Sequence, residues 1–482
     1  MSLVSILILI GLSLGVHLAS LLPFTRRFRI QLLLILSVVV IYWLQPGLPI
    51  RGLDFWLPTA TVFIAVLGWL LTAHPEERGS RGNLLTFLLL SALILLIALT
   101  RYLGAAAFLT PSRPPQIHLV IAVLLCISIL FFALHKLHKT PGKLLALAIF
   151  ALLLLFILLK LPSLTLAASS ALRGLTGQSR ELASAFDIRW LGFSYIAFRL
   201  IHTLRDRQTG HLPALSLEEY LVYMLFFPAF SAGPIDRAER FIKQLRQPDA
   251  PGAKNLAAGG ERLLIGLFKK FVLADTLAMI ALNGQNAGQV QSAGWLWLLL
   301  FAYSFQIFFD FSGYTDIAIG LGHLMGIRLP ENFNTPYLKP SLTRFWDNWH
   351  ITLTQWFRTY FFNPLTRTLR TKARWMPAWL VILVTQLSTM LLIGLWHGMT
   401  LNFILWGLWH GLGLFINNRW SSVARPLAAR AQARPALNRM VVFLSILLTF
   451  TYVSLGWVWF ALPDVSTSLK VFAGLFGIGG GA

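Results

Sequence analysis

The sequence predicts an all-α polytopic membrane protein, and three observations lead to this fold class. Of the 482 residues, 56% are hydrophobic and only 12% are charged, whereas a soluble domain carries about 25% charged residues. Nearly pure apolar runs recur, the clearest being Leu144 to Leu159 between Lys143 and Lys160. The basic residues stand mostly in short segments between such runs. Because a helix needs about 20 apolar residues to cross a bilayer core of about 30 Å, the runs predict membrane spans.

About twelve transmembrane helices are predicted, together with re-entrant or interfacial helices. The first run lacks a basic segment before it and a cleavage signature after it, so we expect a span and not a signal peptide. The formal net charge of +22 is assigned to membrane topology, so no nucleic-acid partner is expected. The single Cys126 rules out a disulfide framework within the chain. The predicted spans lie near residues 3–22, 31–46, 55–73, 84–101, 117–134, 144–160, 187–204, 262–284, 293–321, 377–396, 400–418 and 439–461.

Basic residues in the loops predict which loops face the cytoplasm. The loops after the first, third and fifth spans qualify, with Arg26, Arg27 and Arg29, then Arg78 and Arg81, then Lys136, Lys139 and Lys143. The same alternation leaves basic residues on both sides of two apolar stretches, Tyr220 to Ala232 and Phe345 to Leu365. We therefore expect both stretches to re-enter or to lie in the interface without crossing. Re-entrant backbone needs protein or a water-filled cavity around it, which predicts a polar cavity reachable from the cytoplasm.

Two carboxylates stand inside the apolar run near residues 293–321, where a charge at mid-bilayer costs at least about 2.5 to 3.5 kcal/mol. In a helix, Asp310 and Asp316 would lie on nearly opposite faces, with Gly313 between them as a candidate break. One interpretation is that they hold a polar cavity or orient a catalytic group. The other is a structural hydrogen bond to a neighbouring helix or to an arginine, and both stay open.

His350 lies in a stretch that is dense in aromatic, basic and polar residues, Arg344 to Thr354. In a helix, Asp347 would sit one turn before His350 and Thr354 one turn after it. Either side chain would then be placed to fix the imidazole tautomer. The same composition also suits an ordinary amphipathic helix at the membrane interface.

His397 lies between two glycines at the junction of two apolar spans. An imidazole with a pKa near 6.5 serves as a base at neutral pH, which is commonly worth about 10² to 10⁴ in rate. The alternative is a buried histidine that hydrogen-bonds a neighbouring span, and Trp409-His410-Gly411 repeats the local pattern. Catalytic zinc needs three protein ligands, which do not stand at ligand spacing here, so no metal is expected. The chain also has no Gly-x-Ser-x-Gly elbow and no glycine-rich nucleotide-binding loop, so neither a serine triad nor a bound cofactor is expected.

A set of short motifs occurs in a fixed order over about Leu191 to Leu414. They are Gly192-Phe193-Ser194-Tyr195, Leu225-Phe226-Phe227-Pro228 with Ala232-Gly233-Pro234-Ile235, Gly266-Leu267-Phe268-Lys269-Lys270 with Ala274-Asp275, Phe309 to Asp316, Leu329-Pro330-Glu331-Asn332-Phe333-Asn334, Phe345 to Leu353, and Trp396-His397-Gly398. Together they resemble the bacterial branch of the membrane-bound O-acyltransferase (MBOAT) family, and most closely its alginate O-acetyltransferase-like members. The sequence departs from many relatives at Asp347-Asn348, where those carry two arginines.

The resemblance implies a bundle of transmembrane helices with re-entrant segments around a central tunnel. It places the family's invariant histidine on His397 and a second conserved histidine on His350, which are therefore the expected catalytic residues. It also divides the chain into N-terminal transmembrane helices without a recognised motif, residues 1–180, and an MBOAT-like catalytic core, residues 181–482. The residues expected to line or support the tunnel are Asp310, Asp316, Asn334, Trp346, Trp349 and Trp396.

The implied activity transfers an acyl group, first of all acetyl, from a cytoplasmic thioester donor to an extracytoplasmic polysaccharide hydroxyl or to a relay partner. The donor would be acetyl-CoA or an acyl carrier, and His397 would be the general base. Expected partners are membrane lipid and a periplasmic or extracellular acyl-relay or glycan-modifying protein, at the plasma or inner membrane. The alternatives are a D-alanyl-transfer protein for teichoic acids, a lipid or polysaccharide transporter, and a catalytically silent scaffold. A transporter predicts paired halves with interrupted spans, and the sequence shows no such symmetry.

Overall fold

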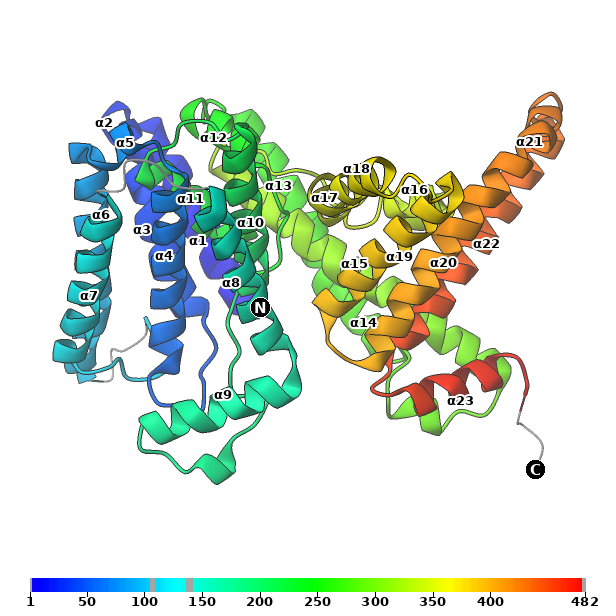
Figure 1. Ribbon diagram of the computed structural model, residues 1–482, viewed down its shortest axis with the longest axis horizontal. Helices are drawn as coiled ribbons and strands as arrows, with labels where there is room; N and C mark the ends of the chain where they lie inside the picture. The colour runs from blue at the N-terminus through cyan, green and yellow to red at the C-terminus, as the bar shows by residue number, and fades with distance from the viewer. Residues whose placement is uncertain (1, 105–108, 136–141, 479–482) are drawn as a thin grey trace. The chain divides into compact units, whose positions relative to one another are not determined.

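Figure 1 shows the computed structural model of the chain, which describes residues 2–104, 109–135 and 142–478. In these ranges the regular structure is helical, apart from one isolated β-bridge between Phe333 and Trp349. The predicted all-α fold class is therefore confirmed. Lys136 and Lys139, which were expected in a cytoplasmic loop, lie outside the described residues.

Eight helices in the described part of the chain are long and apolar enough to cross a membrane, so the chain is a multi-pass membrane protein. Each overlaps one of the predicted spans. They are α1 (Leu3–Leu21), α4 (Leu53–Thr72), α6 (Arg81–Leu99) with the 3-10 turn η1 (Thr100–Tyr102), α7 (Ile117–His135), α8 (Gly142–Lys160), α15 (Ala293–Leu324), α19 (Ala378–His397) and α22 (Pro435–Ala461).

The other four predicted spans correspond to helices that are short, broken or more polar, so a count of twelve stays a prediction. The span near residues 262–284 is interrupted by a π-helix, and the one near 400–418 is a 23-residue helix that carries several polar side chains. In chain order these elements are α3 (Arg29–Leu44), α10 (Phe193–Thr209), α13 (Ala253–Leu267) with π-helix η5 (Phe268–Ala274) and α14 (Asp275–Ala278), and α20 (Leu401–Val423).

The chain forms two compact units. Unit 1 comprises residues 1–263 and 318–329, and unit 2 comprises residues 264–317 and 330–482. Helices α13 and α15 each begin in one unit and end in the other. The division at residue 180 was drawn from motifs and not from compactness, and it stays a prediction.

Unit 1 contains the N-terminal helices and helix α11 (Leu217–Leu225), which packs against α3, α4 and α6. A capping box starts α11, in which the hydroxyl of Ser216 accepts from the backbone N–H of Glu219. The remaining elements of unit 1 are α2 (Pro23–Arg26), α5 (Pro75–Arg78), α9 (Pro162–Leu175), η3 (Arg180–Leu182), α11 (Leu217–Leu225), η4 (Phe227–Ala229) and α12 (Ala238–Arg246).

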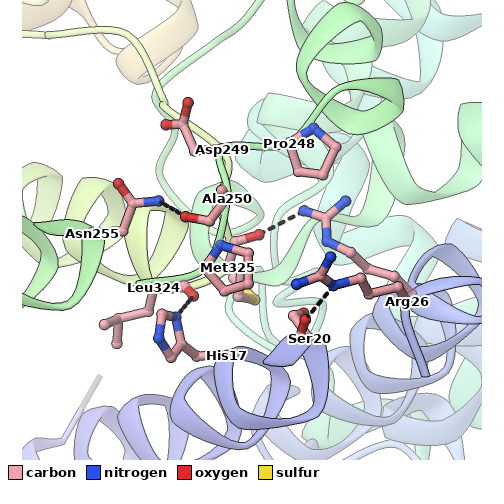
Figure 2. Close-up of a pocket in the computed structure, with 12 residues that line it drawn as sticks. His17, Ser20, Arg26, Pro248, Asp249, Ala250, Asn255, Leu324 and Met325 are labelled. Atoms are coloured by element: carbon pink, nitrogen blue, oxygen red, sulfur yellow. Dashed lines mark hydrogen bonds between the residues drawn. The ribbon is translucent and has the colours of Figure 1, made fainter. Parts of the chain in front are cut away.

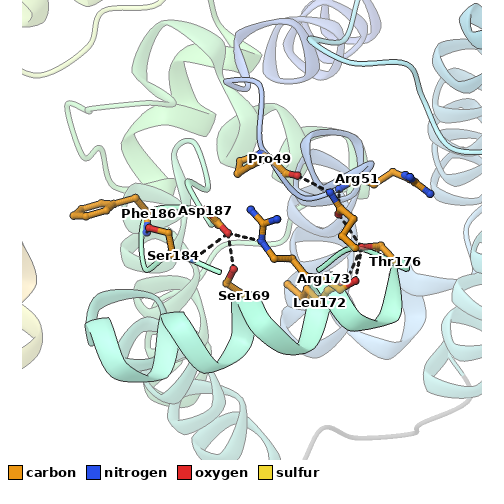
Figure 3. Close-up of polar contacts among 10 residues, drawn as sticks. Pro49, Arg51, Ser169, Leu172, Arg173, Thr176, Ser184, Phe186 and Asp187 are labelled. Atoms are coloured by element: carbon orange, nitrogen blue, oxygen red, sulfur yellow. Dashed lines mark hydrogen bonds and ion pairs between the residues drawn. The ribbon is translucent and has the colours of Figure 1, made fainter. Parts of the chain in front are cut away.

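Helix α9 is tied to the loop that follows it by a buried ion pair (Figure 3). Nε of Arg173 lies 2.9 Å from Oδ2 of Asp187, and both side chains are less than a tenth exposed. The same carboxylate oxygen accepts from the hydroxyl of Ser169 at 2.6 Å and from the backbone N–H of Ser184 at 3.2 Å. Breaking one partner of such a pair leaves an uncompensated charge, so Asp187 stabilises this end of unit 1.

Unit 2 contains the helices that carry both predicted catalytic histidines. Helices α19, α20 and α22 lie side by side (Figure 1). The first two approach closely because Gly394 and Gly407 replace side chains at their contact: a Cβ on Gly394 would lie 2.3 Å from the carbonyl oxygen of Phe403. The remaining elements of unit 2 are η6 (Asn286–Gly288), η7 (Pro336–Leu338), α16 (Leu342–Trp346), α17 (Ile351–Phe357), π-helix η8 (Arg358–Phe362), α18 (Asn363–Lys372), α21 (Arg425–Gln432) and α23 (Val465–Leu475).

The two stretches that were expected not to cross differ in length. Helix α11 has nine residues, which at 1.5 Å per residue span about 14 Å, and η4 adds one further turn. The second stretch begins with the short helix α16 and continues as α17, η8 and α18, which follow one another without a break over residues 351–372. The first stretch is therefore too short to cross, while the placement of the second and the cytoplasmic cavity stay predictions.

Candidate active site

His350 stands where α16 ends and α17 begins, in a left-handed backbone conformation with φ 44°. The segment that precedes η7 stabilises this break between α16 and α17 through two backbone hydrogen bonds. The backbone N–H of Asn334 donates to the carbonyl of Asn348 at 3.1 Å, and that of Ile351 donates to the carbonyl of Asn332 at 2.9 Å. The motif around residues 330–334 therefore fixes the turn that presents His350.

The side chain of Asn332 determines the tautomer of His350. Its Oδ1 lies 3.2 Å from the backbone nitrogen and 2.9 Å from the hydroxyl of Thr352, and 3.1 Å from Nδ1 of His350. Because a backbone N–H only donates, the amide oxygen must face it, and Nδ1 of His350 must then carry a proton to donate. In the neutral ring, Nε2 is left with the lone pair.

Nε2 of His350 is buried and has no hydrogen-bond partner among the described residues. Burial first, and the nearby His397 second, lower the pKa of His350 to about 3, so the ring is neutral at physiological pH. The ring is 3% exposed and lies edge-on to Phe311, with 4.7 Å between ring centroids. His350 is thus a fixed, neutral hydrogen-bond acceptor at Nε2.

This geometry overturns the sequence-based expectation for the partners of His350. The helix breaks just before the histidine, so Asp347 does not lie one turn before it. Thr354 does lie one turn after it, because its backbone N–H donates to the carbonyl of His350 at 3.0 Å. Asp347 instead pairs with Arg358, and the hydroxyl of Thr354 donates to the carbonyl of Trp349 at 3.4 Å. The group that sets the tautomer is the side chain of Asn332, 18 residues earlier in the sequence.

His397 is the last residue of α19 and is half-buried among aromatic rings. Its ring centroid lies 4.5 Å from that of Trp396 and 4.8 Å from that of Phe460. Trp396 also contacts His350, at 6.2 Å between centroids, so the two predicted catalytic histidines belong to one cluster. A Cβ on Gly398 would lie 2.6 Å from the ring of Phe403, which explains the glycine after His397.

His410 is a third histidine of the same cluster, although its sequence context only looked like a repeat. Its ring is fully buried, and neither ring nitrogen has a hydrogen-bond partner among the described residues. Trp406 connects the two histidines, with centroids 4.9 Å from His410 and 5.5 Å from His397. In the described part of the chain, no three His, Cys, Asp or Glu side chains are placed to hold a metal ion.

Asp310 and Asp316 both form ion pairs with the neighbouring π-helix η5. Oδ2 of Asp316 lies 2.7 Å from Nζ of Lys269, and Asp310 pairs with Lys270. The structural interpretation of the two carboxylates is therefore the one that the contacts support. Gly313 does not break α15; a Cβ there would lie 2.8 Å from the carbonyl oxygen of Gly266, so the glycine permits close helix packing.

The remaining predicted site residues divide into a buried group and an exposed one. Trp349 packs against Phe333 and Trp457, with centroids 5.1 and 5.2 Å away. Trp346 lies 5.1 Å from His410. Asn334 is exposed and contributes its backbone N–H, whereas Asn332, two residues earlier, is fully buried and contacts His350. The expectation that Asn334 lines or supports the tunnel stays a prediction, and sequence reasoning did not single out Asn332.

Comparison with known proteins gives one family and several relatives. The family model for membrane-bound O-acyltransferases matches residues 116–457. Probable alginate O-acetylase AlgI of Pseudomonas aeruginosa is 35% identical over 294 residues, 60% of this chain and 52% of that protein. Peptidoglycan O-acetyltransferase of Helicobacter pylori is 33% identical over 290 residues, 58% and 52% of the two chains. Teichoic acid D-alanyltransferase of Streptococcus thermophilus is 31% identical over 284 residues, 57% and 68%. The matched part spans about half the length of the first two relatives.

Proposed function

Because the chain belongs to the membrane-bound O-acyltransferase family, we propose that it transfers an acyl group, acetyl in the first instance, to a hydroxyl acceptor. The donor is a thioester presented from the cytoplasm, either acetyl-CoA or an acyl carrier. The acceptor is an extracytoplasmic polysaccharide, or a periplasmic or extracellular protein that relays the group to one. The protein then works in the plasma or inner membrane, in contact with membrane lipid.

The observation that carries the proposal is the pair of histidines around Trp396. His397 is half-buried and sits at the end of a helix, so it is the member that a substrate reaches. His350 is buried and holds a lone pair on Nε2. An accessible base beside a fixed acceptor supports proton transfer from a hydroxyl in a site that excludes water.

The reaction requires no covalent enzyme intermediate. His397 takes the proton from the acceptor hydroxyl, and the hydroxyl oxygen attacks the thioester carbonyl. The new C–O bond forms, the C–S bond breaks, and the departing thiolate takes the proton back from His397. His350 shares the proton by accepting a hydrogen bond at Nε2. The aromatic rings around both histidines lower the local dielectric, which strengthens these interactions.

O-acetylation is favoured for the acceptor chemistry because two of the compared relatives are named for it, and the sequence motifs point the same way. D-alanyl transfer is the second candidate, supported by a relative of which the match covers 68%. The donor distinguishes them, since acetyl-CoA carries acetyl whereas a loaded carrier protein delivers D-alanine. Supplying each donor to the same purified preparation decides between the two.

Thioester consumption by the purified, membrane-reconstituted protein tests the proposal. His397→Ala should reduce acetyl-CoA cleavage at least about 100-fold, the lower bound of what a general base supplies. His211→Ala, at an exposed histidine outside the cluster, serves as the matched control and should retain the wild-type rate. Wild-type activity in a correctly inserted His397→Ala variant would overturn the mechanism. Absence of thioester cleavage with every donor, alongside measurable glycan or lipid transport, would favour the transporter alternative.

A further inference from the structure

A cavity of about 250 Å³ lies in unit 1 where the chain leaves its first span (Figure 2). Its walls come from four segments distant in sequence. They are the end of α1, the short helix α2 with the start of α3, the loop between α12 and α13, and the end of α15. The side chains that bear on its chemistry are those of His17, Arg26, Arg29, Asp249 and Asn255.

The positive charge of this cavity is not neutralised from within the protein. Arg29 is 7% exposed, and its guanidinium donates to two backbone carbonyls, those of Leu245 at 3.3 Å and Met325 at 2.6 Å. Nε of Arg26 donates to the carbonyl of Ser20 at 2.9 Å. In the described part of the chain no carboxylate lies within ion-pair distance of either arginine. The one carboxylate in the wall, Asp249, already pairs with Arg328 at 2.5 Å.

The cavity is held open by hydrogen bonds between its walls. Nδ1 of His17 donates to the carbonyl of Leu324 at 2.9 Å, which joins two walls (Figure 2). Within the wall between α12 and α13, the side-chain amide of Asn255 donates to the carbonyl of Ala250 at 2.9 Å. The backbone N–H of Asp249 donates to Gly326 at 3.2 Å. The cavity therefore has a fixed shape before anything binds.

The cavity lies beside an apolar surface that a lipid would cover. The last turn of α1 and the residues after it expose large apolar side chains, Leu18 at 61%, Leu22 at 59% and Phe24 at 67%. The guanidinium of Arg27 lies over the ring of Phe28, 4.5 Å from its centroid, an arrangement suited to the headgroup region. An apolar span that ends in exposed aromatic and basic side chains marks the membrane interface.

We propose that this cavity binds the phosphate of an anionic membrane phospholipid, with the acyl chains lying along α1. A buried guanidinium without a carboxylate matches a phosphate through paired N–H donors, and the second arginine adds charge at the mouth. The neighbouring apolar surface selects a lipid over a free phosphate ion. The basic loop that contains both arginines predicts the cytoplasmic leaflet, where anionic lipids attract such residues.

Lipid binding is measured with the full-length protein in detergent, by the shift in its thermal-unfolding midpoint and by native mass spectrometry. Phosphatidylglycerol should raise the midpoint and stay bound, while phosphatidylcholine should do neither. Arg26→Gln should weaken phosphatidylglycerol binding by at least about fivefold, because a charge-assisted hydrogen bond to the phosphate is lost. Arg26 is exposed and makes a single hydrogen bond to the backbone, so this variant tests the site without disturbing the fold. Arg29→Gln should weaken phosphatidylglycerol binding further.

Arg27→Gln is the matched control, because it removes the same charge from the adjacent residue, which does not line the cavity. It should retain phosphatidylglycerol binding within about twofold of wild type. An equal loss in Arg26→Gln and Arg27→Gln would show general surface attraction and overturn the site. Inorganic phosphate that protects as well as the lipid would show a free-anion site and overturn the lipid assignment, as would equal protection by phosphatidylcholine.

Discussion

Asn332→Ala tests whether the asparagine makes His350 competent. The substitution removes Oδ1, which accepts hydrogen bonds from Nδ1 of His350 and from two groups of Thr352. The imidazole then loses the bond that selects its tautomer and holds its orientation. We expect a lower kcat with a smaller change in KM, because the asparagine acts through the histidine and not through substrate.

The size of the effect follows from the lost hydrogen bonds. One neutral hydrogen bond contributes about 0.5 to 1.5 kcal/mol net, so without it the useful tautomer falls by up to about tenfold. Looser orientation of the ring adds to this, which gives a decrease in kcat of about 10- to 100-fold. The loss stays below the 10² to 10⁴ expected when the base itself is removed.

Asn332→Asp separates a role in positioning from a structural one. A carboxylate of the same shape still accepts from the three donors of the native site, so the turn should remain folded. Its negative charge stabilises the protonated imidazole and raises the pKa of His350 in the variant. Nε2 of His350 accepts a hydrogen bond only when the ring is unprotonated, so the acidic limb of the pH–rate profile should move to higher pH.

The assay is acetyl-thioester cleavage as a function of substrate concentration and pH, with membrane insertion checked for each variant. Asn418→Ala, at an exposed asparagine of α20, controls for loss of an amide elsewhere and should keep the wild-type kcat. The reasoning fails if inserted Asn332→Ala keeps more than about half of the wild-type kcat and Asn332→Asp leaves the pH profile unmoved.

Three further predictions concern stability and the helix end at the site. Burial, reinforced by the adjacent carboxylate of Glu219, raises the pKa of Glu218 from 4.5 to about 7. The stability that its bound proton contributes is therefore lost as the pH rises from 4.5 through about 7. Glu218→Gln should accordingly raise the unfolding midpoint more at pH 8 than at pH 5. Asp187→Asn should lower the midpoint by several degrees, the effect of about 2 kcal/mol, whereas exposed Glu181→Gln should not. Gly398→Ala should reduce kcat several-fold, because its Cβ would lie 2.6 Å from the ring of Phe403 beside His397, the proposed base. Gly82→Ala, with open space around it, should leave kcat unchanged.

The membrane-spanning helices were predictable because their signal is local. An apolar run between basic residues, such as Leu144 to Leu159, needs no partner to be recognised, and the structure has a helix over Gly142–Lys160. The four predicted spans that correspond to weaker helices owe their form to tertiary contacts. The π-helix after Leu267, for example, places two lysines against the carboxylates of α15.

Of the candidate site, the sequence singles out the two histidines and not the residues that support them. His350 and His397 are conspicuous because polar side chains are expensive among apolar ones. Asn332 acts across 18 residues through a turn whose left-handed histidine no helical periodicity indicates. The repeat around His410 is visible in the sequence, but its place in the same cluster follows only from the packing of α20 beside α19.

The different burial of the histidines gives each a different chemical task. A base must meet its substrate, and of the three rings only that of His397 is half-buried, while His350 and His410 are closed off by aromatic side chains. His350 has a hydrogen bond that fixes one nitrogen and leaves the other as an acceptor. His410 has no such bond among the described residues, so nothing selects its tautomer, and its contacts with Trp346 and Trp406 are those of a packing residue. This difference in burial fits the proposed proton transfer by His397 and His350, with His410 packed in the aromatic wall between α16 and α20.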